Sequence, residues 1–337
     1  MKVHYYSITD EIHGRPIAEV QSSSIDGLKS EFSPAKLAEQ NAYTFIDILI
    51  EDETEDIEAN LEALRLKEII DISQDVMEEI ITDQRPRADD YPNFFLILFK
   101  CFTLDPGNSK FQLKEHQIGI LIRKNVIISI HRPIAAMPIS MVFQRFNKYP
   151  LKMAKGGLTY LVTTYLDIMV DQVYDVLNNW SNLIAEYERE LVQNPRKDLL
   201  FDILKIRHRL LDLVKILQAD REIVNNMKLG VYDQIKADLV PPELDDHIKH
   251  MLDETDIVRN LLNELLNIYY SSESAHLNET MKRFTFITSL ILVPSLIAGI
   301  FGMNFFTGDV WGMYIVIVIM LLIVTGLFFY FKRKKYI

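Results

Sequence analysis

The chain has 337 residues, 49% of them hydrophobic and 25% charged, and its formal net charge is −11. Of its 36 basic and 47 acidic residues, six basic and one acidic residue lie at or after Lys282, which leaves 30 and 46 in the part before it. An acidic body does not suit a nucleic-acid-binding protein, which normally presents a basic face. The single cysteine, Cys101, excludes an intrachain disulfide and a zinc site made of several cysteines. The first residues lack the apolar stretch of a signal peptide, so none is expected.

Residues 1–150 alternate strand-like and helix-like patterns, which predicts an α/β domain that ends near Tyr149. Strands are predicted in segments rich in Ile, Phe, Val and Tyr: Val3–Ile8, Tyr43–Ile50, Phe94–Leu104, Gln117–Arg123 and Val126–His131. Helices are predicted over Thr54–Ala63 and Leu66–Thr82, with a further short helix after Pro138. The stretch between Pro86 and Pro92 is predicted to be a loop.

Residues 151–240 are predicted to form a pair of long antiparallel helices after a break at Gly156-Gly157. The first helix would span Leu158–Leu191 and the second Arg196–Met227. Asn194-Pro195 separates them, because proline disfavours a helical conformation in the residue before it.

A third helix is predicted to begin at Pro241-Pro242, since proline suits the first turn of a helix. No strong stop signal follows until the end of an apolar run that begins at Phe284. A helix of about 60 residues would be roughly 90 Å long, which is too long for a globular core. Residues 241–283 are therefore expected to be a stalk that continues into the membrane.

The predicted stalk has two different faces. An apolar seam, interrupted by one threonine, repeats with alternating spacings of four and three: Leu244, Ile248, Met251, Thr255, Val258, Leu262, Leu265 and Tyr269. A polar line lies nearly opposite: Asp246, Asp253, Asn260, Asn267 and Ser274. Toward the C terminus this line continues through small and polar positions: Asn278, Thr285, Thr288 or Ser289, Leu292, Ser295, Gly299 and Gly302. In the stalk itself, a solvated surface is the simplest interpretation of such a line.

Two uncharged runs, Phe284–Gly308 and Val310–Phe331, each exceed the roughly 20 residues that cross a bilayer as a helix. We expect transmembrane helices at 284–304 and 312–331, joined by an outer loop at 305–311. Basic residues precede the first run and follow the second, whereas the loop between the runs has none. Both termini, including the basic tail at 332–337, are therefore expected in the cytoplasm. A pair of buried core helices is the less favoured alternative, because soluble core helices rarely lack a polar face.

Within a membrane, hydroxyls and glycines on one helix face pack against other helices or line a water path. A hairpin of two helices cannot enclose a pore, so a pore would require several copies of the chain. Pro294 lies in the middle of the first span, where it can kink the helix. Simple helix packing remains the alternative for this face.

The first predicted span ends in Gly302-Met303-Asn304, just before the outer loop, and it begins after Asn278–Lys282. With the preceding Pro294–Phe301 and the basic C terminus, this arrangement closely resembles the CorA family of divalent-cation channels. The resemblance covers nearly the whole chain; Asp75–Glu79 and the Arg85-Pro86-Arg87 segment with Phe94–Phe99 fit it less specifically. The loop Phe305–Asp309 departs from the acidic loop of many members and leaves Asp309 alone to attract cations.

The resemblance implies a funnel-shaped homopentamer in the cell membrane, with an α+β cytoplasmic domain, a long helical stalk and a pore lined by the first span. Such channels conduct Mg²⁺ passively, also pass Co²⁺ or Ni²⁺, and close when cytoplasmic Mg²⁺ binds. The outer mouth would be Gly302, Met303 and Asn304, and Met303 favours magnesium over zinc. The pore would be lined by Asn278, Met281, Phe284, Thr285, Thr288, Leu292, Ser295 and Gly299.

The resemblance also implies a regulatory Mg²⁺ site between neighbouring cytoplasmic domains. Its best candidates are Glu243 and Asp246, followed by Asp253, with Asp89 or Asp90 as the partner. Acidic residues buried together repel each other unless a cation lies between them. Solvated helix carboxylates remain the alternative.

Mg²⁺ holds its waters octahedrally at about 2.1 Å and sheds them reluctantly. Neutral oxygens of Gly302 and Asn304 could accept hydrogen bonds from that hydration shell without stripping it. A divalent ion that crosses 100 mV gains about 4.6 kcal/mol, so no nucleotide is expected. Alternatives are a zinc, cobalt or nickel transporter of the same fold and, in another class, a membrane-anchored signalling or scaffold protein. An enzyme is disfavoured because no nucleophile–base set is visible.

Overall fold

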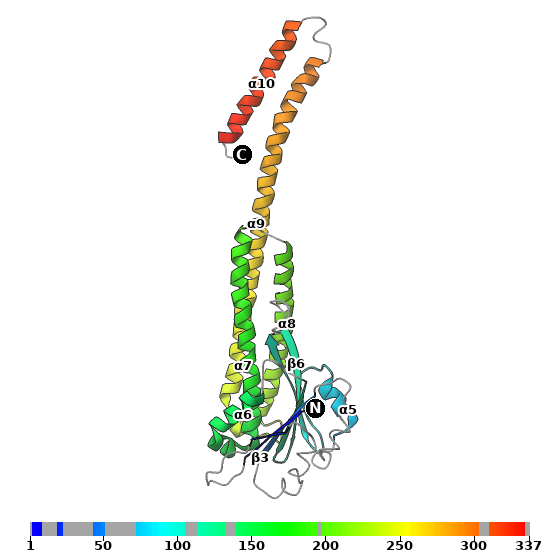
Figure 1. Cartoon of the computed structure of the whole chain (residues 1–337), viewed down its shortest axis with the longest axis vertical. Helices are drawn as coiled ribbons and strands as arrows, with labels where there is room; N and C mark the ends of the chain where they lie inside the picture. Colours follow the sequence, from blue (N-terminus) through cyan, green and yellow to red (C-terminus); the bar gives the residue numbers. More distant parts are fainter. Residues whose placement is uncertain are drawn as a thin grey trace. The chain divides into compact units, whose positions relative to one another are not determined.

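The computed structural model describes residues 2–8, 19–22, 43–50, 72–104, 113–132, 139–193, 197–302 and 310–333, and Figure 1 shows its helices and strands. The chain divides into two compact units. The first comprises Met1–Glu186 and Phe201–Asn263, and the second comprises Tyr187–Leu200 and Glu264–Ile337.

The first unit contains a seven-stranded mixed sheet with the order β2-β1-β3-β7-β6-β5-β4. Its strands are β1 (Lys2–Ile8), β2 (Glu19–Ser22), β3 (Tyr43–Leu49), β4 (Arg87–Asp90), β5 (Phe95–Leu104), β6 (Leu113–Arg123) and β7 (Val126–His131). Neighbouring strands are antiparallel except β3 and β7, which are parallel. The predicted α+β fold class is confirmed.

The structure corrects several predicted boundaries. The predicted loop between Pro86 and Pro92 contains strand β4, which pairs with β5 at the edge of the sheet. β2 was not predicted, and β6 begins at Leu113, before the predicted start at Gln117. Of the predicted helix Leu66–Thr82, the described part forms helix α5 only over Gln74–Ile81. The predicted helix Thr54–Ala63 lies outside the described residues.

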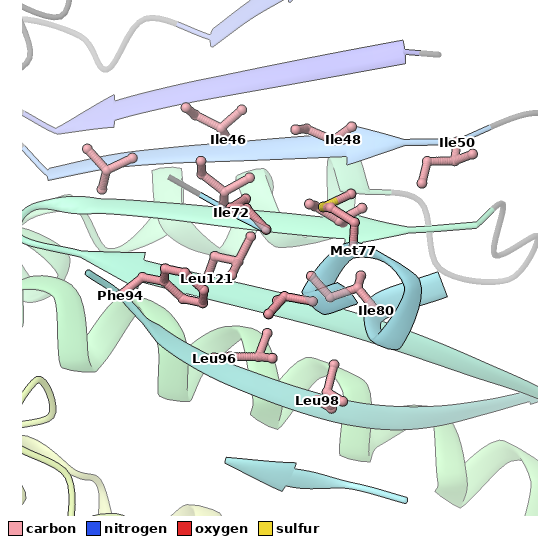
Figure 2. Packing of buried hydrophobic residues seen from close by; sticks show 14 residues of the cluster. Ile46, Ile48, Ile50, Ile72, Met77, Ile80, Phe94, Leu96, Leu98 and Leu121 are labelled. Atoms are coloured by element: carbon pink, nitrogen blue, oxygen red, sulfur yellow. The ribbon is translucent and has the colours of Figure 1, made fainter. Parts of the chain in front are cut away.

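Both faces of the sheet are covered in the first unit. On one face, Val76, Met77 and Ile80 of α5 pack against strand residues of the core cluster, as Figure 2 shows. Gly119 of β6 allows this close packing, because a Cβ atom there would lie 2.6 Å from a methyl of Ile80. On the other face, the ring of Phe45 lies 5.2 Å from that of Tyr165, measured between centroids. Burial on both faces explains why β3 is buried along nearly its whole length.

Long helices follow the sheet: α6 (Ile139–Lys148), α7 (Pro150–Gln193), α8 (Lys197–Lys228), α9 (Pro242–Gly302) and α10 (Val310–Arg333). A short 3₁₀ helix, η1 (Ala237–Leu239), precedes α9. α7 begins earlier than the predicted Leu158, but Gly157 interrupts it with φ of 59° and ψ of −152°. Glycine is favoured there both by the positive φ and because a Cβ atom would lie 2.8 Å from the Tyr43 hydroxyl.

Helix α9 is continuous over 61 residues, as predicted, which corresponds to roughly 90 Å. All eight residues of its predicted apolar seam are at most 6% exposed: Leu244, Ile248, Met251, Thr255, Val258, Leu262, Leu265 and Tyr269. The residues of the polar line in the stalk are all exposed: Asp246, Asp253, Asn260, Asn267 and Ser274. The predicted division of the stalk into two faces is confirmed.

Candidate functional site

Helices α9 and α10 are long and apolar enough to cross a membrane. The most apolar window of α9 has a mean hydropathy of 1.8 and none of it is buried, whereas that of α10 has a mean hydropathy of 2.7 and is 6% buried. Core helices of soluble proteins are instead mostly buried. The exposure of both segments therefore fits helices whose outer surface contacts lipid.

One face of the C-terminal part of α9 is directed toward α10. The ring of Phe286 lies 5.5 Å from that of Phe331 and 6.3 Å from that of Phe328, measured between centroids. The partly covered residues Phe286, Leu290, Val293 and Ile297 follow each other at spacings of four, three and four. This spacing is that of a single helix face, which contacts the second span of the same chain.

The predicted pore residues lie on roughly the opposite side of α9, at a rotation of ~100° per residue. All of them are exposed in the chain: Asn278, Met281, Phe284, Thr285, Thr288, Leu292, Ser295 and Gly299. Thr288 continues this line better than Ser289, which is partly covered and donates a hydrogen bond to the Thr285 carbonyl at 2.7 Å. We call these residues the open face of α9.

Gly299 of the open face and Gly302, one turn further along, are not required by contacts within the described part of the chain. A Cβ atom added at Gly299 or Gly302 would meet nothing within 4 Å. Pro294 lies inside the helix without ending it. Small residues here leave room for whatever the open face meets outside its own chain.

The predicted outer mouth lies largely outside the described residues. Gly302 is the last residue of α9, and Met303 and Asn304 are not described. Of the predicted outer loop at 305–311, Val310 and Trp311 already belong to α10. At the other end, α10 continues through Lys332 and Arg333, beyond the predicted end of the second span at 331.

The predicted regulatory carboxylates are distributed over two elements of the first unit. Glu243, Asp246 and Asp253 are exposed on α9, whereas Asp89 and Asp90 lie on the edge strand β4. Across the described residues, no three His, Cys, Asp or Glu side chains are arranged to hold a metal ion.

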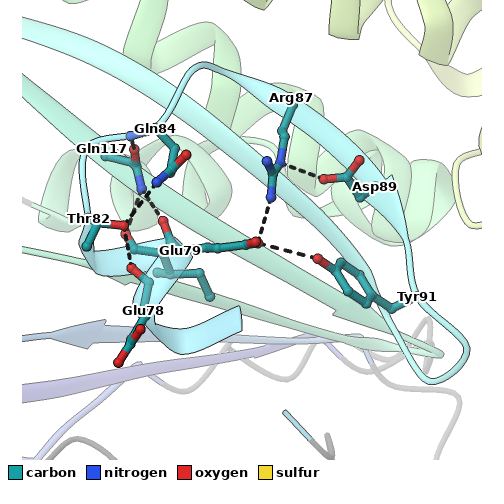
Figure 3. Close-up of polar contacts among 9 residues, drawn as sticks. Glu78, Glu79, Thr82, Gln84, Arg87, Asp89, Tyr91 and Gln117 are labelled. Atoms are coloured by element: carbon teal, nitrogen blue, oxygen red, sulfur yellow. Dashed lines mark hydrogen bonds and ion pairs between the residues drawn. The ribbon is translucent and has the colours of Figure 1, made fainter. Parts of the chain in front are cut away.

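A polar network fixes the surroundings of Asp89, as Figure 3 shows. Asp89 lies 2.7 Å from the guanidinium of Arg87, which also donates a hydrogen bond of 2.6 Å to Glu79 of α5. Tyr91 donates a longer hydrogen bond, 3.4 Å, to the same Glu79 oxygen. β4 is thus held to α5 by ionic contacts as well as to β5 by pairing.

The start of α9 is held on two sides by charged contacts that the sequence did not predict. Asp245 accepts hydrogen bonds from Arg221 at 2.9 Å and from Lys228 at 3.1 Å, both on α8. Burial opposes ionisation of Asp245, but these two bonds outweigh it and lower the pKa of its carboxyl. His247 lies 2.9 Å from Asp167 and 3.3 Å from Asp171, both on α7.

Arg145 of α6 completes this second group, 2.7 Å from Asp167 and 3.2 Å from Asp171. The hydrogen bond to Asp167 raises the pKa of His247, against a smaller opposing effect of burial. We call Asp245 and His247, with their partners, the stalk clamp. Asp246 lies between the two clamp residues and is exposed, so the clamp fixes the helix without engaging the predicted regulatory carboxylate.

Comparison with known proteins agrees with this organisation. The sequence model of the family described as CorA-like Mg²⁺ transporter protein matches residues 23–333. The cobalt/magnesium transport protein CorA of Thermotoga maritima is 28% identical over 282 residues, which cover 81% of this chain and 79% of that protein. The protein of the same name from Methanocaldococcus jannaschii is 24% identical over 285 residues, which cover 82% of this chain and 88% of that protein.

The fold also matches that of a solved structure. The CorA magnesium transporter from Methanocaldococcus jannaschii superposes with a TM-score of 0.72 at 20% identity, over 99% of this chain and 98% of that one. At this identity the likeness establishes the fold, including the long helix and the two C-terminal apolar helices.

Proposed function

Because the chain belongs to the family of CorA-like Mg²⁺ transporter proteins, we propose that it is a passive channel that conducts hydrated Mg²⁺ across the cell membrane. The observation that carries the proposal is the open face of α9. It lies within an apolar segment, it contains hydroxyls and glycines, and α10 covers the other side of the helix. The N and C termini would be cytoplasmic, because the basic residues flank the inner ends of both spans.

In the proposed channel, identical chains stand around a common axis with the open face turned inward, as a homopentamer. Side-chain and backbone oxygens of Thr288, Ser295 and Gly299 would accept hydrogen bonds from the waters of Mg²⁺, which the ion holds at about 2.1 Å. Met281, Phe284 and Leu292 would form apolar rings, which can close a pore by excluding water. Gly302, Met303 and Asn304 would form the outer mouth.

The membrane potential would drive the ion inward without a nucleotide, since crossing 100 mV is worth about 4.6 kcal/mol to a divalent cation. Members of this family are transporters, so we do not propose an enzymatic reaction. We propose Co²⁺ as a second cargo, because the name of the relative from Thermotoga maritima includes cobalt.

We further propose that cytoplasmic Mg²⁺ closes the channel by binding between chains. Glu243, Asp246 and Asp253 of one chain would face Asp89 or Asp90 of its neighbour. The exposure of the α9 carboxylates, which leaves them accessible to a neighbouring chain, supports this arrangement. A cation between carboxylates of two chains would offset their mutual repulsion.

The outer mouth is tested by Mg²⁺ influx into liposomes that contain the full chain. Asn304→Ala is expected to reduce influx at least about tenfold, because it removes one neutral oxygen per chain from the mouth. Asn263→Ala, an exposed amide on the stalk outside the open face, is the matched control and should conduct like the wild type. Equal influx in all three proteins would remove the mouth assignment.

The regulatory site is tested with the same liposomes and Mg²⁺ on the cytoplasmic side. The Glu243→Lys/Asp246→Lys variant should leave influx insensitive to that Mg²⁺, because it places positive charge where the ion would bind. The Asp256→Lys/Glu264→Lys variant, changed at exposed positions elsewhere on α9, is the control. Normal inhibition in the Glu243/Asp246 variant would discard the site.

Zinc transport by the same fold and a membrane-anchored scaffold remain the competing functions. Competition between Mg²⁺ and Zn²⁺ for influx separates the first from the proposal. A scaffold has no need of a polar line inside the membrane, so it predicts that Ser295→Leu leaves the function of the protein unchanged.

A further inference from the structure

We infer that the inner end of the α9–α10 hairpin binds the headgroups of anionic phospholipids through Lys282 and Arg283 of α9 and Lys332 and Arg333 of α10. This site is distinct from the ion path and does not depend on the proposed channel activity. The argument uses only residues of the second unit.

The ring contacts bring the basic residues of both helices to one depth. Phe286 of α9 lies beside Phe331 of α10, with 5.5 Å between ring centroids. At a rise of about 1.5 Å per residue, Arg283 lies ~4.5 Å beyond Phe286 and Arg333 lies ~3 Å beyond Phe331, both toward the same end of the hairpin. Arg283 and Arg333 therefore lie at nearly the same level, within about 2 Å, and Lys282 and Lys332 lie within about 5 Å of each other along the axis.

The direction of these side chains separates them from the open face. Around the axis of α9, Lys282 and Arg283 lie within about 60° of the face that contacts α10, and thus away from Ser295 and Gly299. On α10, Arg333 lies about 140–160° from the two rings that contact α9, those of Phe328 and Phe331, whereas Lys332 lies about 40–100° from them. All four side chains are exposed at the same end of the hairpin, and we call them the basic surface.

Few acidic residues lie near this surface in the sequence. Between Ser274 and Gly302 and between Val310 and Arg333, the only acidic residue is Glu279. Its contact with Arg283, at 2.6 Å, joins two largely exposed side chains, and such pairs are weak and exchange readily. Two further lysines, Lys334 and Lys335, follow in the sequence.

The surroundings favour a lipid over a free phosphate. Next to the cations, α10 exposes apolar and amphipathic rings, with Phe329 63% and Tyr330 58% exposed. A guanidinium can bind a phosphate through two parallel hydrogen bonds, while rings at this depth contact the start of the acyl chains. Basic clusters just inside a membrane span are typical sites for anionic headgroups.

Binding is tested on the full-length chain in neutral detergent, by native mass spectrometry with phosphatidylglycerol or phosphatidylcholine as the probe. The wild type should bind phosphatidylglycerol more tightly than phosphatidylcholine. The Lys332→Gln/Arg333→Gln variant should lose about fivefold in affinity for each charge removed, about 25-fold in all. Inorganic phosphate should not compete at matched concentrations.

Control variants distinguish charge from packing. Arg207→Gln/Arg209→Gln removes the same charge from exposed positions of α8 and should bind like the wild type. Lys332→Arg keeps the charge and should keep the affinity. If the double variant does not fold, Lys332→Gln alone should still show the fivefold loss. Equal affinity for the two lipids, unchanged binding after charge removal, or an equal loss in the α8 control would each overturn the inference.

Discussion

The two halves of α9 form one helix but differ in which side chains they bury. From Leu244 to Tyr269 the chain buries the apolar seam and leaves the polar line exposed. From Tyr270 to Gly302 none of the side chains that the structure describes is buried. The N-terminal half therefore has its apolar residues covered within one chain, whereas the C-terminal half does not.

This difference has a physical cause. In water, an apolar stripe must be covered, and α7 and α8 supply both the packing and the stalk clamp. In a bilayer, an exposed apolar surface needs no cover, so α10 alone is sufficient on one side. The remaining anomaly is the open face, where hydroxyls and glycines would meet hydrocarbon unless other copies or water cover them.

The largest effect is expected from a substitution that disrupts the N-terminal half of α9. Leu262→Asp places a charge in a fully buried position of the seam and should cost about 4 kcal/mol or more of the free energy of unfolding. Asn260→Asp, two residues away on the exposed line, should cost less than about 0.5 kcal/mol. Urea unfolding of the two detergent-solubilised proteins measures the contrast. Similar stability would show that the seam is not a core.

The next largest effect concerns conduction and tests the C-terminal half. Gly299→Leu should leave the fold intact, because nothing within the described chain lies within 4 Å of the added Cβ atom. If copies surround a shared axis, it should nevertheless reduce Mg²⁺ influx at least about tenfold, because apolar rings exclude water. Gly326→Leu on α10 has an equally open position and should conduct normally. Equal influx for the two variants would contradict an inward-facing position for Gly299.

Features that depend on spacing along one element could be predicted from the sequence. The seam was one, since a 4-3 pattern implies a buried stripe whichever helices cover it. The strand Val126–His131 was another, because Ile and Val are enriched in strands.

Features that depend on partners distant in sequence could not be predicted. β4 contains Asp89 and Asp90, and aspartate is depleted in strands, so only its pairing with β5 makes this segment extended. His247 and Asp167 of the stalk clamp are 80 residues apart. The proposed regulatory site is harder still to predict from the sequence, because we propose that its two parts belong to different chains.

A smaller effect is expected from the stalk clamp. Asp245→Asn removes the charge that binds Arg221 and Lys228 and should lower the free energy of unfolding by about 2 kcal/mol. Because the pKa of Asp245 is lowered, its stabilisation is present above the ordinary aspartate pKa of about 4 and is lost as the pH falls through the lowered value. Asp246→Asn, at the exposed neighbour, is the control and should unfold like the wild type in Mg²⁺-free buffer. If Asp246→Asn lowered the free energy of unfolding as much as Asp245→Asn, the contacts of Asp245 in the stalk clamp would not be the cause of the loss.

The smallest effect is the pH dependence contributed by His247. Since its folded pKa is raised, its stabilisation is fully present below the ordinary histidine pKa of about 6.5 and is lost as the pH rises through the raised value. The contribution should be below about 1 kcal/mol, because the side chain is 27% exposed and solvent weakens its pairs with Asp167 and Asp171. Denaturant midpoints measured from pH 5 to 9 should converge for the wild type and His247→Gln at high pH and separate at low pH. His250→Gln, at an exposed position one turn away, should follow the wild type throughout. Parallel curves for the wild type and His247→Gln would mean that the histidine holds the start of α9 by packing and not by charge.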